Sequence, residues 1–142
     1  MTTTTAPDYA SPPVSQPRPS KGVLWTGRVI SALPVLMLLM GAIMTLARVP
    51  QAVEGTRQLG LSDRAGMLIG VTLLACTLLY IIPWTAVLGA ILLVGYLGGA
   101  VFVHVHAGEH GQMWTPVVVG VLLWLGLLLR EPRLRALLPF RR

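Results

Sequence analysis

Three histidines and one glutamate lie close together in the stretch HVHAGEHG, which begins at His104. Imidazole nitrogens and carboxylate oxygens are common ligands of Zn²⁺ and similar ions. On a regular helix His106 and His110 share a face beside Glu109, whereas His104 and His106 point in nearly opposite directions. Gly108 is expected to end such a helix. The stretch therefore predicts either a metal site formed by His104, His106, His110 and Glu109, or an exposed polar turn that changes charge near neutral pH.

Two tyrosines and one cysteine lie within apolar runs. Tyr96 is in the middle of its run, so its hydroxyl needs a partner, either a nearby protein oxygen or a bound ligand. Tyr80 is near the end of its run, a position typical of tyrosines that anchor a helix at a membrane surface. Cys76 is the single cysteine, which excludes an internal disulfide and a dithiol mechanism and indicates a packed thiol.

The amino-acid composition restricts the class of protein to which these residues belong. Of the 142 residues 54% are hydrophobic and 11% are charged, and the mean hydropathy is +0.73. Soluble domains have about 25% charged residues, so the composition excludes an ordinary soluble domain. The net charge of +6 comes from bases that flank apolar runs and follow the last one. This pattern predicts contact with a lipid bilayer and no binding of nucleic acid.

Four apolar runs predict an all-α integral membrane protein, a four-helix transmembrane bundle with short loops. We place the spans at about 29–47, 65–82, 84–105 and 113–129. Pro34 lies in the first two turns of the first span, where the lack of a backbone N–H destabilises a helix least. The 44 residues 65–108 contain no Lys, Arg, Asp or Glu, and one straight helix of that length would reach about 66 Å. Pro83 is therefore expected to divide them at a tight turn.

The polar connection 48–64 is interpreted as an ordinary re-entry loop, with a short helix from Pro50 to Gly60 as the alternative. Ser62 or Asp63 is expected to cap the following span. Small residues four apart predict close helix packing at three places, namely Gly41/Thr45, Gly66/Gly70 and Gly95/Gly99. The Gly95/Gly99 pair is also a candidate contact between copies of the chain.

The termini and the charges predict an orientation. Residues 1–27 form a Thr/Pro/Ser-rich tail expected to be disordered and cytoplasmic, 28–130 form the membrane domain, and 131–142 form a basic amphipathic tail. An even number of spans places both termini on one side, which carries eight Lys and Arg against three on the other. The positive-inside rule then predicts both termini inside, in a multi-pass protein of the bacterial cytoplasmic (inner) membrane.

Several motifs together resemble the DoxX-like family of small bacterial membrane proteins. They are YIIPWT, the segment AVLGAILLVGYLGGAVFVHV at 86–105, and the end WLGLLLREPRLRALLP. The resemblance covers about residues 29–139 and implies a four-helix bundle of the inner membrane. Relatives often have Lys where this chain has Thr45, and an acidic residue where it has Leu73. Only Tyr96 and His104 match the family pattern as candidate site residues.

The resemblance implies a role near redox enzymes, because some relatives are subunits of quinone-reducing complexes and others accompany oxidative-stress enzymes. We expect a non-catalytic membrane subunit or accessory protein of a redox or stress-related complex, with no catalytic residues of its own and with membrane or redox proteins as partners. One alternative is a quinone-interacting subunit in which Tyr96 and His104 contact the quinone. Another is a metal-handling or transport protein that uses the turn from His104 to His110. No charged residue lies inside the four spans, which argues against a proton-coupled pump.

Overall fold

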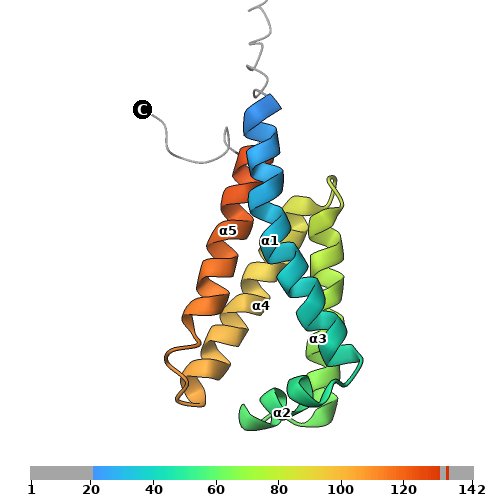
Figure 1. The fold of residues 1–142 in the computed structure, drawn as a ribbon, viewed down its shortest axis with the longest axis vertical. Coiled ribbons are helices and arrows are strands. Elements are labelled where there is room, and N and C mark those ends of the chain that lie inside the picture. Colours follow the sequence, from blue (N-terminus) through green and yellow to red (C-terminus); the bar gives the residue numbers. More distant parts are fainter. Residues whose placement is uncertain (1–20, 132–133, 135–142) are drawn as a thin grey trace, which may run out of the picture.

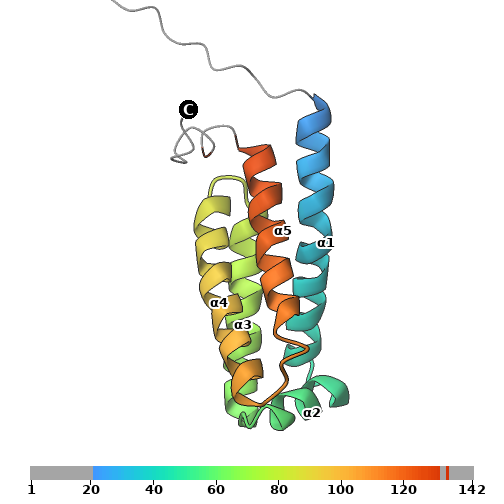
Figure 2. The same cartoon turned by 90° about the vertical axis from the view of Figure 1, so that its left-hand side faces the viewer.

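The computed structural model describes residues 21–131 and 134, and within them every regular element is a helix. The helices are α1 (Lys21–Leu46), α2 (Pro50–Gln58), α3 (Asp63–Ile81), α4 (Ala86–His106) and α5 (Trp114–Arg130). The four longer helices run side by side, and α2 lies across one end of them (Figures 1 and 2). The start of α1, the turn between α3 and α4, and the end of α5 lie together at the opposite end (Figure 1).

The four longer helices form a ring, in which α1 packs against α3 and α5, and α4 packs against the same two neighbours. Leu93 and Leu123 are fully buried at the centre, whereas Leu33 and Phe102 on the outer surface are about 70% exposed. Helices α1, α3 and α4 are long and apolar enough to cross a membrane, and α5 is an apolar helix of 17 residues. The outward apolar surface is what lipid-facing helices require.

Helix α1 begins earlier than the sequence indicated. Residues 21–27, expected to belong to a disordered tail, form the first turns of α1, while residues 1–20 lie outside the described residues. Pro34 is consequently buried in the middle of a 26-residue helix rather than near its start. The expected amphipathic tail 131–142 also lies outside the described part, except for Glu131 and Leu134.

The predicted break at Pro83 is confirmed. Helix α3 ends at Ile81 and α4 begins at Ala86, so four residues reverse the chain. The hydroxyl of Thr85 donates a 2.8 Å hydrogen bond to the carbonyl of Leu79, which accepts no helical bond at the end of α3. Trp84 is 97% exposed at the tip of this turn.

The connection after α1 contains the short helix that was only the alternative interpretation. Pro50 is in the first turn of α2, and Gly60 follows its end with φ +74°, a conformation that glycine adopts without strain. Ser62 caps α3 as predicted, because its hydroxyl accepts a hydrogen bond from the backbone N–H of Ala65.

Of the predicted small-residue pairs, some glycines face a neighbouring element and others face open space. Gly66 and Gly70 pack closely, since a Cβ on them would lie 3.1 Å from the methyl groups of Thr56 and Thr45 respectively. Their predicted role in close packing is confirmed. A Cβ on Gly41, Gly95 or Gly99 would meet nothing within 4 Å, so within the described bundle these three glycines mediate no helix contact.

Candidate functional site

The histidine turn joins α4 to α5 and brings together only two of its four candidate ligands. Nδ1 of His104 lies 3.0 Å from Oε2 of Glu109, and both side chains are partly buried. The ring of His106 stacks on Phe102, while His110 donates from Nδ1 to the carbonyl of Gly108. In the described part of the chain no three His, Cys, Asp or Glu gather as a metal site would require.

The two candidate quinone contacts are not brought together either. Tyr96 is half-buried against the core, and its hydroxyl has no hydrogen bond within residues 21–131 and 134. His104 follows Tyr96 by eight residues on the same helix, which separates their backbones by about 12 Å. Any ligand that touched both would have to extend along α4.

A buried polar contact that the sequence did not indicate is centred on Tyr80. Its side chain is 1% exposed, and its hydroxyl donates a 2.8 Å hydrogen bond to the carbonyl of Leu123 on α5. Oγ of Ser31 on α1 lies 3.1 Å from the same hydroxyl and donates to it. The interpretation of Tyr80 as a surface anchor is therefore wrong, because Tyr80 links three helices inside the bundle.

Arg130, the last residue of α5, lies over this contact. Its guanidinium carbon is 5.2 Å from the centre of the Tyr80 ring, and Nε and Nη2 are buried without a hydrogen-bond partner among the residues that the structure describes. The face of an aromatic ring attracts a cation and partly replaces lost hydration. Gly27 on α1 makes room for the arginine stem, since a Cβ there would lie 2.9 Å from Cγ of Arg130.

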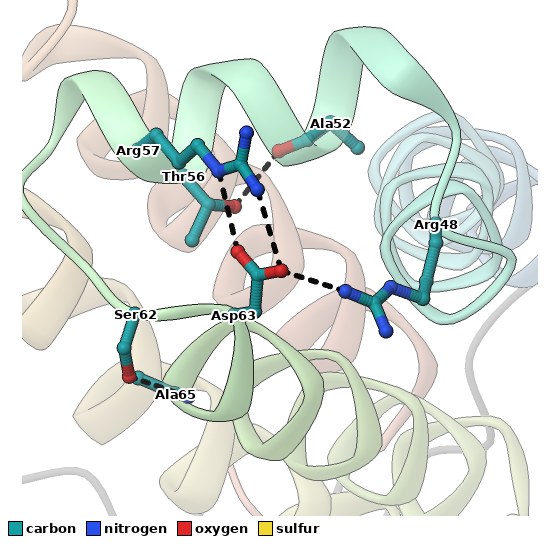
Figure 3. A network of polar contacts seen from close by, with 7 residues as sticks. All are labelled: Arg48, Ala52, Thr56, Arg57, Ser62, Asp63 and Ala65. Atoms are coloured by element: carbon teal, nitrogen blue, oxygen red, sulfur yellow. Dashed lines mark hydrogen bonds and ion pairs between the residues drawn. The ribbon is translucent and has the colours of Figure 1, made fainter.

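At the other end of the bundle, two arginines form a network around Asp63 (Figure 3). Nη2 of Arg48 lies 2.7 Å from Oδ2 of Asp63, and Arg57 approaches the same carboxylate with Nε at 3.3 Å and Nη2 at 3.4 Å. The network ties the end of α1 and the helix α2 to the start of α3. Sequence reasoning considered Asp63 only as a cap and missed its ion pairs, because these depend on how α2 folds back.

A pocket of about 260 Å³ lies beside this network, between the end of α1, α2 and the start of α3. Its polar lining comes from Thr45, Arg48, Thr56, Asp63 and Arg64. The remaining wall is apolar. Cationic, hydroxyl and apolar groups around one small cavity are suited to a small amphiphilic ligand.

A larger groove of about 580 Å³ runs between α4 and α5 on the outer surface. It is almost entirely apolar, with Leu97 and Trp124 among the lining residues, and Gly98 and Gly120 leave space for it. Such a surface can accommodate a hydrocarbon chain. Neither Tyr96 nor His104 lines it.

Comparison with known proteins gives a family and no individual relative. No curated protein and no solved structure matches the chain. The model of the DoxX-like family matches residues 29–126, which include all of α2, α3 and α4 and most of α1 and α5. The match extends over more than half of the chain and agrees with the apolar helices of the bundle. The chain is thus a membrane protein that belongs to the DoxX-like family.

Proposed function

We propose that the chain is a four-span protein of the bacterial cytoplasmic membrane with both termini in the cytoplasm, and that it acts as a non-catalytic subunit or accessory protein of a redox or stress-related complex. The antiparallel arrangement supports the four spans, because α5 packs against α1 and α4, which are both long enough to cross a membrane. The sequence supports the orientation, because eight Lys and Arg lie before residue 29 or after residue 129 and three lie between them.

The observation that carries the subunit role is the open face of α4, which we define by Gly95, Gly98 and Gly99. All three glycines are exposed, and a Cβ on any of them would meet nothing within 4 Å. Gly98 also borders the apolar groove between α4 and α5. Small residues beside a groove allow the backbone of another membrane helix to approach closely, so this face suits a partner helix or a second copy of the chain.

Purification of the tagged chain from its native membrane in a mild detergent tests the role. We expect a membrane or redox protein to co-purify with the wild-type chain and to be lost in Gly99→Leu, whose side chain blocks the open face. Gly41→Leu is the matched control, because Gly41 on α1 also has open space in front of it. A chain that purifies alone, or a partner that both variants retain, would contradict the proposal.

The α4–α5 groove favours one alternative, a quinone-interacting subunit. Its apolar lining suits an isoprenoid tail. The quinone ring would then lie outside the groove, where Tyr96 or His104 would donate a hydrogen bond to its carbonyl. Purified protein should then retain quinone, Gly120→Leu should displace it by filling the groove, and His104→Ala should reduce the amount bound. A preparation from quinone-rich membranes that contains no quinone would exclude this alternative.

A further inference from the structure

The pocket between α1, α2 and α3 has an excess of positive charge. Arg48 and Arg64 line it, and Arg57 on α2 contacts Asp63 of the lining (Figure 3). Asp63 is the only acidic residue of the lining, and its carboxylate is already engaged by Arg48 and Arg57. Glu54 of α2 is exposed and accepts a hydrogen bond from Gln58 instead. The charge that remains around the cavity is therefore cationic.

The hydroxyl groups of the pocket do not compete with the arginines as donors. Thr45 donates its hydroxyl proton to the carbonyl of Gly41 at 2.8 Å, and Thr56 donates to the carbonyl of Ala52 at 2.8 Å. Arg64 makes no hydrogen bond or ion pair with the described residues, so its guanidinium donors are available to a ligand. Guanidinium groups in such a setting prefer an oxyanion, to which they donate two parallel hydrogen bonds.

The backbone holds Arg48 in an unusual position. Arg48 has φ +54°, the only positive φ of a non-glycine residue between 21 and 131. This conformation costs free energy and persists where surrounding contacts require it, often at binding sites. Here the contact with Asp63 at 2.7 Å uses one nitrogen of Arg48, a residue that lines the cavity.

The position of the pocket in the fold is one that a lipid phosphate could reach. The residues that line the pocket lie where α1 ends and α3 begins. At this end of the bundle the polar helix α2 crosses the apolar helices (Figure 1). In a membrane this is the depth of the lipid phosphates. The apolar part of the wall, with Val53 and Met67, suits the carbon atoms attached to a phosphate group.

From this geometry we propose that the pocket binds a phosphate group, with Arg48 and Arg64 as its ligands and with Asp63 and Arg57 as the residues that position Arg48. The phosphate belongs either to an anionic phospholipid or to a small soluble phosphate. The proposal is independent of the subunit role, because none of the residues that line the pocket belongs to α4 and because it needs no partner protein.

Thermal unfolding of the full chain in dodecyl maltoside, followed by tryptophan fluorescence, measures binding as a rise in Tm. The probes are dihexanoyl phosphatidylglycerol, inorganic phosphate and neutral dihexanoyl glycerol. A rise with the phospholipid alone assigns the site to lipid, and a rise with inorganic phosphate as well assigns it to free phosphate. No rise with either phosphate probe, or an equal rise with the neutral lipid, overturns the proposal.

Variants distinguish binding in the pocket from a general attraction of the anionic probe to the positively charged protein. Arg64→Gln removes one ligand and should weaken binding about tenfold or more, whereas Arg28→Gln, an exposed arginine on α1 far from α2, should leave it unchanged. Ala52→Leu should abolish binding by filling the cavity while every charge stays in place. Arg64→Gln that binds like the wild type, or an equal loss in Arg28→Gln, contradicts the assignment.

Discussion

Replacement of Gly89 by alanine should destabilise the bundle more than its small size suggests. Gly89 lies in the first turn of α4, pressed against the end of α3, and an added Cβ would be 2.6 Å from Cα of Tyr80 and 2.7 Å from the carbonyl carbon of Leu79. Ordinary contacts begin at 3.4 Å, so α3 and α4 would have to separate by most of an ångström. Because the opposing atoms are backbone, no side-chain rotation relieves the clash.

The cost can be worked out from two opposing terms. Overpacking of this kind typically costs about 1–3 kcal/mol, and alanine returns up to about 1 kcal/mol through its higher helix propensity. We therefore expect Gly89→Ala to lower the free energy of unfolding by about 1–2 kcal/mol. Gly98→Ala on the same helix is the matched control, because its Cβ would meet nothing within 4 Å. That variant should be neutral or slightly more stable.

Unfolding of both variants in the same detergent, monitored by tryptophan fluorescence, gives the comparison directly. The expected order of Tm is Gly89→Ala below the wild type, and the wild type at or below Gly98→Ala. If Gly89→Ala unfolded at the same temperature as Gly98→Ala, the close approach of α3 and α4 at Tyr80 would be refuted.

Three further substitutions test the polar contacts and one backbone position. Tyr80→Phe removes the hydrogen bonds to Leu123 and Ser31 and should cost about 1–3 kcal/mol in detergent unfolding, whereas Tyr96→Phe should have little effect. Asp63→Asn removes ion pairs that are largely exposed and should cost no more than about 1 kcal/mol, with a smaller difference from the wild type in high salt. Gly108→Ala forces a side chain into φ +79° and should cost about 1 kcal/mol, an effect that Gly111→Ala would not share.

The features that the sequence predicted depend on neighbouring residues. Pro83 cannot continue a helix, so the break between α3 and α4 was visible without tertiary information. Ser62 was recognisable as a cap because a hydroxyl shortly before an apolar run can accept hydrogen bonds from the free N–H groups of the first helical turn. The pair Gly66 and Gly70 also packs as predicted, since both glycines lie on one face of α3.

The features that were missed depend on helix rotation and on partners distant in the chain. Gly27 and Gly126 meet across α1 and α5, and neither belonged to a small-residue pair that the sequence analysis identified. Tyr80 is buried because Gly89 and its neighbours let α4 approach its backbone, which periodicity cannot show. Gly95 is the opposite case: its spacing to Gly99 is typical of a packing pair, but the residue faces outward and contacts no other helix of the described bundle.

The arrangement of the candidate metal ligands in the histidine turn was also only partly predictable from the sequence. Gly108 ended α4 as predicted, and its positive φ turns the chain so that Glu109 returns to His104. The separation of His104 from His106 follows from their spacing on a helix, as expected. The direction of the chain after that turn was not readable from the sequence, so the pairing of His104 with Glu109 and the separation of His110 from this pair were not predicted. The Asp63 network was missed for the same reason, because Arg48 and Arg57 reach Asp63 only when α2 folds across the bundle.

The central claim is a four-span bundle whose α2 side faces outward, and labelling of single cysteines tests it most directly. In a Cys76→Ala background, Gln58→Cys, Gln112→Cys and Lys21→Cys place one thiol each at exposed positions on the two ends of the bundle. In right-side-out membrane vesicles an impermeant maleimide should label positions 58 and 112 at once, and position 21 only after the membrane is permeabilised. Labelling of position 21 in intact vesicles, or of only one of positions 58 and 112, would contradict the account.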